Sequence, residues 1–312
     1  MTAALPDFSE TVVVRAPGKV NLALCVGGLD EHGYHDLATV FQAVSLFDDI
    51  TVSPNPGGGI ELTISGEGAD VVPTDHTNIA WRAAELLARH LGTVADVSIH
   101  IAKGIPVAGG MAGGSADAAG TLVACDALWE SRVPREVLYR LAAELGADVP
   151  FSLHGGTALG LGRGDQLTSV LVRGGFHWVF ALAIGGLSTP SVYSKLDELR
   201  GDRAIPEPRV PDAVLTALSS GDTTALASAL LNDLQAPAVA LRADLQRVLD
   251  AGLEAGALAG LVSGSGPTCA FLARDHVHAV DIAVNLSSAG VCRTVKTAEG
   301  PAQGARVISP GH

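Results

Sequence analysis

The chain has 312 residues, enough for two domains with a substantial core, and its formal net charge is −13. This acidic balance argues against sequence-independent binding to nucleic acids or anionic membranes, because both require a basic surface. No apolar run is long enough to span a membrane, and the first residues lack the basic and apolar regions of a signal peptide, so we expect a cytoplasmic protein.

The N-terminal segment alternates between strand patterns and turns. Strands are predicted at residues 11–15 and 20–26, with a break at residues 16–18 directly before Lys19. Taken alone, a single lysine is usually a solvated surface charge. The turn-forming run at residues 27–36 carries one aromatic residue and two histidines. It is either an ordinary loop or a ligand-facing loop with a ring available for stacking.

Further strands are predicted at residues 41–50 and 60–64, followed by a helix from about residue 78 to 91. Asn78 is a suitable N-cap for this helix and Gly92 a suitable stop. The four cysteines lie far apart in apolar segments, which predicts reduced core thiols and neither a zinc site nor a disulfide framework. They are Cys25, Cys125, Cys269 and Cys292.

Residues 106–117 form a loop with four glycines in six positions. A strand is predicted before it at residues 97–101, and a helix after it with Ser115 as a plausible N-cap. Strand, glycine loop and helix N-terminus together favour phosphate binding, because free N–H groups and the helix dipole face the ligand. The alternative is a structural turn without a ligand. The sequence of this loop matches neither the Walker P-loop motif nor the motif of a Rossmann dinucleotide site.

A helix is predicted from Pro134 to about residue 145, ended by Gly146. The segment that follows is Gly-Ala-Asp-Val-Pro at residues 146–150, in which Pro150 predicts an extended conformation for the preceding valine. An aspartate just past a helix, here Asp148, is most often a turn-former.

The second half of the chain has a mixed pattern after a glycine-rich transition. The elements predicted there are a strand at 176–184, a loop at 200–211, helices from 212 to 252, strands at 258–262 and 268–272, a helix at 275–289 and a strand at 291–295. A second glycine loop at residues 263–267 separates two of these strands, and alone it would be a hairpin turn. The tail from about residue 299 is rich in Gly and Pro and is predicted to be mobile.

Taken together, three segments resemble the motifs of the GHMP kinases, the superfamily of galactokinase, homoserine kinase, mevalonate kinase and phosphomevalonate kinase. They are Ala16-Pro-Gly-Lys-Val-Asn21, Pro106-Val-Ala-Gly-Gly-Met-Ala-Gly-Gly-Ser115 and Val262-Ser-Gly-Ser-Gly-Pro267. The resemblance implies a two-domain α+β fold with a deep cleft. We expect an N-terminal domain at residues 1–165, of a type also found in a ribosomal protein, and a C-terminal α/β sandwich at residues 166–312.

Within the superfamily, the chain is most similar to the members that use ATP to phosphorylate the 2-hydroxyl group of cytidine-diphosphate-linked methylerythritol in isoprenoid synthesis. The segments that carry this similarity are residues 19–22, Gly33-Tyr-His35, residues 146–150 and the Thr189-Pro190 turn. The alternatives are another GHMP kinase, acting on homoserine, mevalonate or a sugar, and a non-catalytic nucleotide-binding member. The last would be expected to lack either the lysine or the aspartate of the motifs.

The resemblance also implies roles for individual residues. Asp148 would be the base that accepts the proton of the substrate hydroxyl, with Lys19 beside it to stabilise the developing charge. The residues implied for ATP are Asn78 near the adenine and, around the phosphates, Pro106, Val107, Ala108, Gly109, Gly110, Met111, Ala112, Gly113, Gly114, Ser115 and Ala116. The residues implied for the acceptor are Tyr34 and Tyr193 on the two faces of cytosine, His35 at its edge, and Asn21 and Thr189.

Three alanines depart from the usual sequence of the glycine-loop motif in this superfamily. Ala108 and Ala112 stand where glycine or leucine is commoner, and Ala116 replaces a serine, which leaves the hydroxyl contacts to phosphate open. We expect Mg²⁺ to accompany ATP, although the sequence identifies no magnesium ligand. It also does not distinguish a monomer from a homodimer.

Overall fold

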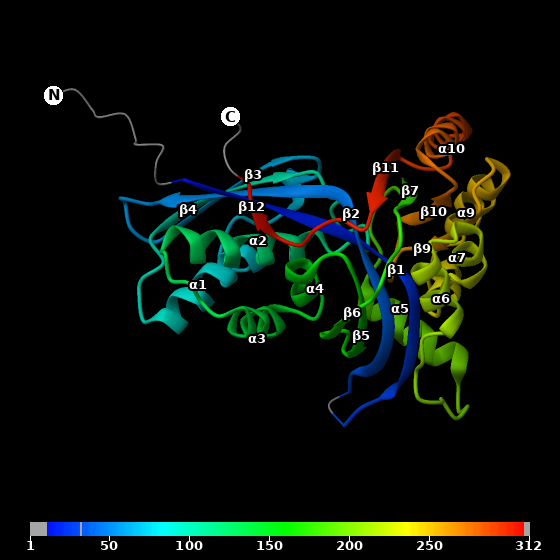
Figure 1. Ribbon diagram of the computed structural model, residues 1–312, viewed down its shortest axis with the longest axis horizontal. Helices are drawn as coiled ribbons and strands as arrows, with labels where there is room; N and C mark the ends of the chain where they lie inside the picture. The colour runs from blue at the N-terminus through cyan, green and yellow to red at the C-terminus, as the bar shows by residue number, and fades with distance from the viewer. Residues whose placement is uncertain (1–10, 32, 309–312) are drawn as a thin grey trace.

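The computed structural model describes residues 11–31 and 33–308. Two β-sheets lie next to each other along the longest axis of the molecule, and each is covered by helices (Figure 1). Within the described ranges, none of the helices combines the length and the apolar character needed to cross a bilayer. The first ten residues, on which the signal-peptide expectation rests, lie outside the described residues.

The first sheet has eight strands, in the order β12-β1-β2-β4-β3, with β5 between β2 and β6 and with β8 beside β1. These strands are β1 (Val12–Leu29), β2 (His35–Pro54), β3 (Ile60–Gly66), β4 (Val97–Lys103), β5 (Thr157–Gly162), β6 (Gln166–Ser169), β8 (Leu231–Asn232) and β12 (Arg306–Val307). A short 3-10 turn, η2 (Ala69–Val71), follows β3. Four helices pack on this lobe: α1 (Ile79–Leu91), α2 (Gly113–Leu128), α3 (Arg135–Leu145) and α4 (Val149–His154).

The predicted break at residues 16–18 is wrong, because β1 continues through it. Its register against β2 shifts between Pro17 and Gly18, so a bulge accommodates the proline, which has no N–H to donate to the ladder. Beyond this bulge, Lys19 and Asn21 are two residues apart on one strand and therefore share a face of the sheet.

The helix predicted at residues 78–91 is confirmed. The side chain of Asn78 accepts a hydrogen bond from the N–H of Ala80, and Gly92 ends the helix in a left-handed conformation with φ of 69°. The expectation that Ser115 caps the next helix is wrong. That helix begins two residues earlier, at Gly113.

Val149 is helical, so the extended conformation predicted for it is wrong. Pro150 lies in the first turn of α4, where its missing N–H leaves no intrahelical hydrogen bond unmade. The proline therefore starts a helix here, and Asp148 sits at its N-cap position.

The second sheet has four antiparallel strands in the order β11-β7-β10-β9. They are β7 (Phe176–Leu182), β9 (Ala259–Val262), β10 (Cys269–Ala273) and β11 (Thr294–Gly300). The helices of this half are α5 (Thr189–Arg200), α6 (Asp212–Ser220), α7 (Thr223–Ala229), α8 (Gln235–Leu241), α9 (Asp244–Glu254) and α10 (His276–Ala289). The helical region predicted from 212 to 252 is confirmed except at β8, which interrupts it.

Strand β7 lies between two hydrophobic cores. Trp178 and Phe180 belong to the core shared with the first sheet, whereas Val179 and Ala181 belong to the core under the second sheet. This alternation follows from the period of two along a strand, and it explains why the segment is apolar throughout. The indole N–H of Trp178 donates to Oε1 of Gln42 at 3.0 Å, which fixes β7 against β2.

The β5–β6 hairpin spans the boundary expected between residues 165 and 166. The tail, for which the composition predicts mobility, leaves β11 and returns to the first sheet, where β12 pairs with β1 (Figure 1). We propose that the boundary between the lobes lies between β6 and β7, and that the tail belongs structurally to the first lobe.

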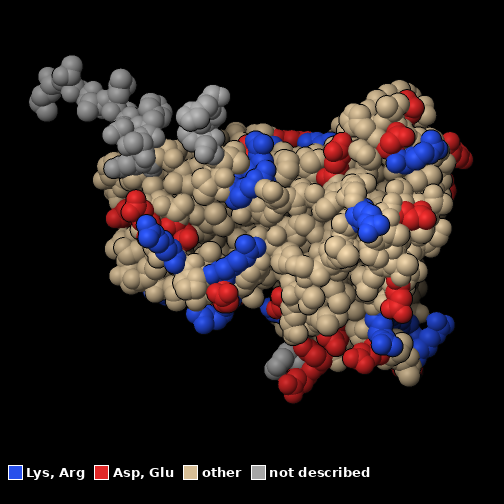
Figure 2. Space-filling view, in the orientation of Figure 1, with Lys and Arg blue, Asp and Glu red and all other residues tan. Residues whose placement is uncertain are grey.

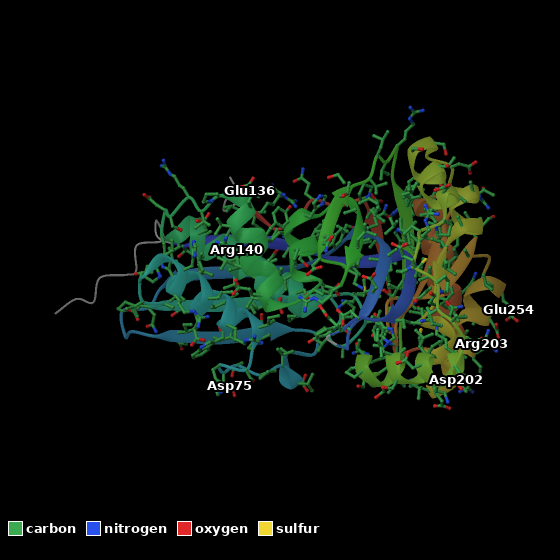
Figure 3. The ribbon with its side chains drawn as sticks, turned by 90° about the horizontal axis from the view of Figure 1, so that it is seen from below. Asp75, Glu136, Arg140, Asp202, Arg203 and Glu254 are labelled. Atoms are coloured by element: carbon green, nitrogen blue, oxygen red, sulfur yellow. The ribbon has the colours of Figure 1, made fainter. Side chains whose placement is uncertain are left out.

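Charged side chains are spread over the surface. On the face shown in Figure 2, Lys and Arg are interspersed with Asp and Glu. The residues labelled in Figure 3 lie at the periphery and are exposed: Asp75, Glu136, Arg140, Asp202, Arg203 and Glu254. A buried charge is therefore worth explaining, and Lys19 is one.

Candidate active site

The three sequence motifs meet in space. The N–H of Lys19 donates to the carbonyl of Met111 at 3.1 Å, and the hydroxyl of Ser263 donates to the carbonyl of Gly110 at 3.2 Å. A Cβ on Gly110 would lie 2.3 Å from the carbonyl oxygen of Ser263, and one on Gly264 would lie 3.2 Å from Nζ of Lys19. Both glycines also have positive φ, so glycine is required where the two loops and the lysine touch.

The second glycine loop connects β9 to β10, and Asn232 of β8 supports it. The side-chain amide of Asn232 donates to the carbonyls of Val262 and Gly264 at 2.7 and 2.8 Å, and its oxygen accepts from the N–H of Leu234. The loop is thus a hairpin connection that is also anchored to the first sheet. Sequence reasoning missed Asn232, because a lone asparagine 30 residues upstream carries no local signal.

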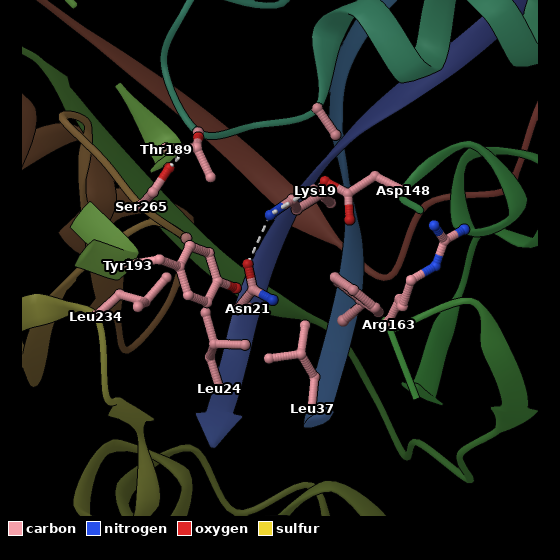
Figure 4. Close-up of a pocket in the computed structure, with 14 residues that line it drawn as sticks. Lys19, Asn21, Leu24, Leu37, Asp148, Arg163, Thr189, Tyr193, Leu234 and Ser265 are labelled. Atoms are coloured by element: carbon pink, nitrogen blue, oxygen red, sulfur yellow. Dashed lines mark hydrogen bonds and ion pairs between the residues drawn. The ribbon is translucent and has the colours of Figure 1, made fainter. Parts of the chain in front are cut away.

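Lys19 is buried, so its interpretation as a surface charge is wrong. Its side chain is 7% exposed, and Nζ donates to Oδ1 of Asn21 at 2.7 Å and lies 3.9 Å from Oδ2 of Asp148 (Figure 4). Asn21 in turn donates to the hydroxyl of Thr39 at 2.8 Å. Nζ is 5.6 Å from the centre of the Phe41 ring. These contacts hold the ammonium group at one point beside the carboxylate.

Asp148 projects into the site from the junction of α3 and α4. Its side chain is 36% exposed, and among the described residues its carboxylate caps none of the N–H groups of α4. The carboxylate is therefore accessible to a ligand while it faces Lys19. Burial, and after it the charge of Asp148, raises the pKa of Tyr193 to about 12, so this phenol is neutral at physiological pH.

A central pocket of about 250 Å³ surrounds this pair. In Figure 4, Asp148 and Arg163 lie on one side of Lys19, and Thr189, Tyr193 and Ser265 lie on the other. The hydroxyls of Thr189 and Ser265 are hydrogen-bonded to each other at 2.8 Å, which joins the start of α5 to the second glycine loop.

A second pocket, of about 380 Å³, lies on the other side of the first glycine loop; we call it the nucleotide pocket. It is lined by Val71, Val72, Pro73, Lys103, Asp117 and all residues from Pro106 to Gly114. The first N–H groups of α2 have no intrahelical partner and open towards an anion. Ala108 and Ala112 have φ of 54° and 59°, which explains why glycine suits these positions.

Three residues expected at the ATP are not among those that line the nucleotide pocket. Ser115 and Ala116 lie in the first turn of α2, Ala116 is fully buried, and their contacts with ATP stay a prediction. Asn78 uses its oxygen to cap α1 and its amide to donate to the carbonyl of Pro73 at 2.7 Å. It thus supports one wall of the nucleotide pocket, and its contact with adenine stays a prediction.

A buried charge cluster lies at the edge of the nucleotide pocket, which two of its members line. Nζ of Lys103 donates to Oδ2 of Asp48 and to Oδ2 of Asp117, both at 2.6 Å. Burial raises the pKa of Asp117 well above its ordinary value; Lys103 opposes this rise and Asp48 adds to it. Oδ1 of Asp117 is buried and has no hydrogen-bond partner among the described residues. Sequence reasoning missed this cluster, whose members come from three separate elements.

A third pocket, of about 600 Å³, extends from the central one; we call it the acceptor pocket. Its lining includes Tyr34, His35, Thr189 and Tyr193. The rings of His35 and Tyr193 are stacked, with centroids 5.1 Å apart and an interplanar angle of 21°. Tyr34 is 55% exposed, and the guanidinium of Arg163 lies 5.4 Å from its ring centre. The residues expected to hold the base therefore share one pocket.

Both nitrogens of His35 already have partners in the protein. Nδ1 lies 3.1 Å from the carbonyl oxygen of Gly27, and Nε2 lies 3.3 Å from Oδ2 of Asp197. Its hydrogen bond to a cytosine edge stays a prediction, and it requires one of these contacts to be exchanged.

The three pockets adjoin one another. The central pocket shares Gly110 and Ala112 with the nucleotide pocket, and Leu37, Arg163, Thr189 and Tyr193 with the acceptor pocket. Lys19 and Asp148 thus stand between a phosphate cradle and a larger cavity, the arrangement required for group transfer between two ligands. Sequence reasoning missed Arg163, although a cation between two glycines was a usable signal.

The family models agree with this geometry. The model of the GHMP kinases N terminal domain matches residues 78–156, and that of the GHMP kinases C terminal domain matches residues 214–292. The chain belongs to the GHMP kinases, which confirms the predicted two-domain α+β fold.

Individual relatives carry a narrower name. The chain is 59% identical over 300 residues to the 4-diphosphocytidyl-2-C-methyl-D-erythritol kinase of Mycolicibacterium smegmatis, covering 96% of this chain and 92% of that protein. It is 58% identical over 308 residues to the enzyme of the same name from Mycobacterium tuberculosis, covering 99% and 96%. A crystal structure of 4-(cytidine 5'-diphospho)-2C-methyl-D-erythritol kinase matches with a TM-score of 0.75 and 32% identity, covering 93% of this chain and 99% of that one. Homoserine kinase from Cytophaga hutchinsonii shares the fold, with a TM-score of 0.74 at 18% identity.

Proposed function

We propose that this chain is an ATP-dependent kinase that phosphorylates the 2-hydroxyl group of 4-diphosphocytidyl-2-C-methyl-D-erythritol in the non-mevalonate isoprenoid pathway. The observation that carries the proposal is the Lys19–Asp148 pair at the point where the nucleotide and acceptor pockets meet. Relatives with this name that are 58–60% identical over nearly the whole chain support the choice of substrate.

In this proposal Asp148 accepts the proton of the acceptor hydroxyl. Its carboxylate faces the central pocket and is partly exposed, so an alcohol can reach it. Lys19 is held by Asn21 within reach of the same point and stabilises the alkoxide character that develops during transfer. Both groups act on the acceptor oxygen, and positioning supplies most of the remaining rate enhancement.

ATP fits the nucleotide pocket because the donors that a phosphate needs are backbone N–H groups at the start of α2, in a loop that leaves no room for side chains at Gly110. Mg²⁺ bound with the nucleotide supplies neutralisation of phosphate charge. Asp117 would be the candidate ligand for this hard cation, because the residue lines the same pocket and its Oδ1 has no hydrogen-bond partner among the described residues.

The acceptor pocket suits a cytidine diphosphate. Tyr34 and Tyr193 offer aromatic faces, and Thr189 offers a hydroxyl at the border of the central pocket. We assign the base to this aromatic region. Arg163 borders both pockets, so its guanidinium is placed to pair with the diphosphate between the base and the reacting hydroxyl.

A small-molecule acceptor also agrees with the net charge of −13, which disfavours nucleic acids as partners. All four cysteines lie in the described part of the chain and are free thiols, which supports a reducing, cytoplasmic location.

The test is an ATP-consumption assay with four acceptors: 4-diphosphocytidyl-2-C-methyl-D-erythritol, homoserine, mevalonate and galactose. We expect kcat/KM for the cytidyl substrate to exceed that for the others by at least about a thousandfold, because a polar pocket strongly rejects ligands that leave its groups unpaired. A preference for any other acceptor would assign the chain to a different GHMP kinase activity. The absence of ATP consumption with all four would contradict the proposal.

A further inference from the structure

Three side chains with metal-ligating atoms converge on the second sheet, away from the active site. His177 on β7 and Glu299 on β11 are directly paired across the two strands, and His276 is the first residue of α10. Nδ1 of His177 lies 3.4 Å from Oε1 of Glu299, and Nδ1 of His276 lies 3.6 Å from the same oxygen. All three ligand atoms lie within 4.8 Å of one another. Figure 1 shows β7, β11 and α10 together at one end of the molecule.

This spacing matches the coordination of zinc. Zn–N and Zn–O distances of about 2.0–2.2 Å in a tetrahedron place neighbouring ligand atoms about 3.3–3.5 Å apart. Both distances to Glu299 are close to that value. The side chain of His276 is 66% exposed, so its ring can rotate to bring the two nitrogens together without moving the core.

One ligand atom of this group is buried without a hydrogen-bond partner. Nδ1 of His177 is buried and has no hydrogen-bond partner among the described residues, although it faces the Glu299 carboxylate. A metal ion bound to the Nδ1 lone pair would supply the missing partner and would lie between this nitrogen and the carboxylate. Polar atoms without a partner in the interior call for such an explanation.

We propose that His177, His276 and Glu299 bind one Zn²⁺ ion. Two imidazoles and a carboxylate are ligands that zinc accepts, and three protein ligands leave a fourth position for water.

The bound ion would stabilise the segment in which the chain passes from the second sheet back to the first. The N–H of Glu299 donates to the hydroxyl of Ser45 on β2 at 2.8 Å, and the chain then leaves β11 to return to the first sheet. A metal that joins Glu299 to β7 and α10 would fix the start of this return. Because the ion binds the folded chain and needs all three elements in place, it would raise the melting temperature.

The experiment is calorimetric titration of the untagged full-length chain with ZnCl₂, without nucleotide, together with thermal unfolding with and without zinc. Co²⁺ serves as a spectroscopic probe, since tetrahedral coordination gives it intense visible absorption. The variants are His276→Gln and Glu299→Gln, and the matched control is His90→Gln on the exposed end of α1.

We expect one saturable site per chain, a zinc-dependent rise in melting temperature and the tetrahedral Co²⁺ spectrum. Each site variant should weaken zinc binding by at least about tenfold and abolish the spectrum, whereas the control should behave like the wild type. Because His276 is exposed, its substitution should not unfold the protein, so a loss of zinc binding in that variant reports on the site itself. Glu299→Gln tests the same site through a second ligand. Absence of saturable binding, or unchanged affinity in both site variants, would overturn the proposal.

Discussion

The interaction between Lys19 and Asp148 offers a quantitative test of the proposed catalytic pair. Their charged atoms are 3.9 Å apart, which corresponds to about 1 kcal/mol in a water-like dielectric and about 4 kcal/mol at an effective dielectric constant of 20. Because the Asp148 side chain is 36% exposed, we place the coupling in the lower part of this range, at about 1–2 kcal/mol. That energy corresponds to about a 5- to 30-fold effect on a rate.

The perturbation is a double-mutant cycle of Asp148→Asn and Lys19→Met, two substitutions that nearly keep side-chain shape. In single-turnover assays with saturating ATP, each variant should lose about a hundredfold or more in turnover, while ATP binding changes little. The double variant should lose less than the product of the single losses, by about 5- to 30-fold. Asp250→Asn, on the exposed surface of α9, serves as a control and should retain activity. Near-normal turnover of Asp148→Asn would remove Asp148 from the mechanism, and fully multiplicative losses would refute the cooperation.

Three further predictions address the two ligand pockets and the contact between the lobes. A Cβ on Gly113 would lie 3.4 Å from Nζ of Lys103. Gly113→Val should therefore lower ATP affinity at least about tenfold in equilibrium binding. Unchanged affinity in a folded variant would contradict phosphate binding by this loop. Stacking contributes about 1–3 kcal/mol per base, so Tyr193→Ala should raise the acceptor KM about tenfold or more, whereas Tyr193→Phe should be nearly silent. If Tyr193→Ala instead lowers the melting temperature and leaves the ratio of acceptor KM to ATP KM unchanged, the ring serves only in packing. Glu67 contacts Arg293 and Lys296 at 2.7 and 2.8 Å. These two cations, and first of all the hydrogen bond from Lys296, hold the pKa of Glu67 below its ordinary value of 4.5. Its stabilisation is therefore complete above that value and is lost as the pH falls through the lowered pKa. Glu67→Gln should lower the melting temperature at pH 7 but not in acid below the lowered pKa, and a difference that persists there would exclude this ion pair as its cause.

The residues that could be predicted from the sequence are those whose chemistry is encoded locally. The first glycine loop indicated a phosphate site because its glycines, the strand before it and the helix after it lie within one short segment. Asn78 and Gly92 indicated the ends of α1, since capping depends on the first and last turns alone. The roles of Lys19 and Asp148 came from the family resemblance, and the structure adds their proximity.

The errors arose where tertiary contacts compete with local preference. Residues 16–18 look like a break, but pairing with β2 continues through them and stabilises a bulged strand, which β12 flanks at residues 14 and 15. Ala112 takes a left-handed conformation that an alanine disfavours by about 1–2 kcal/mol, and this shifts the start of α2 away from Ser115. Asn232 and Lys103 could not be found at all, because their partners lie 14 to 55 residues away.

The residues proposed for catalysis and those proposed to select the acceptor lie in different parts of the structure. The backbone N–H of Lys19 is bonded to the first glycine loop, and Gly264 of the second loop lies against its ammonium group; where the two loops touch there is no room for a side chain at Gly110. The acceptor pocket instead is built from the loop after β1 and from the start of α5, elements that do not touch the nucleotide pocket. Side chains in these two elements can therefore differ without displacing the catalytic pair. Tyr193 variants should therefore alter the acceptor KM, whereas Asp148 variants should alter turnover.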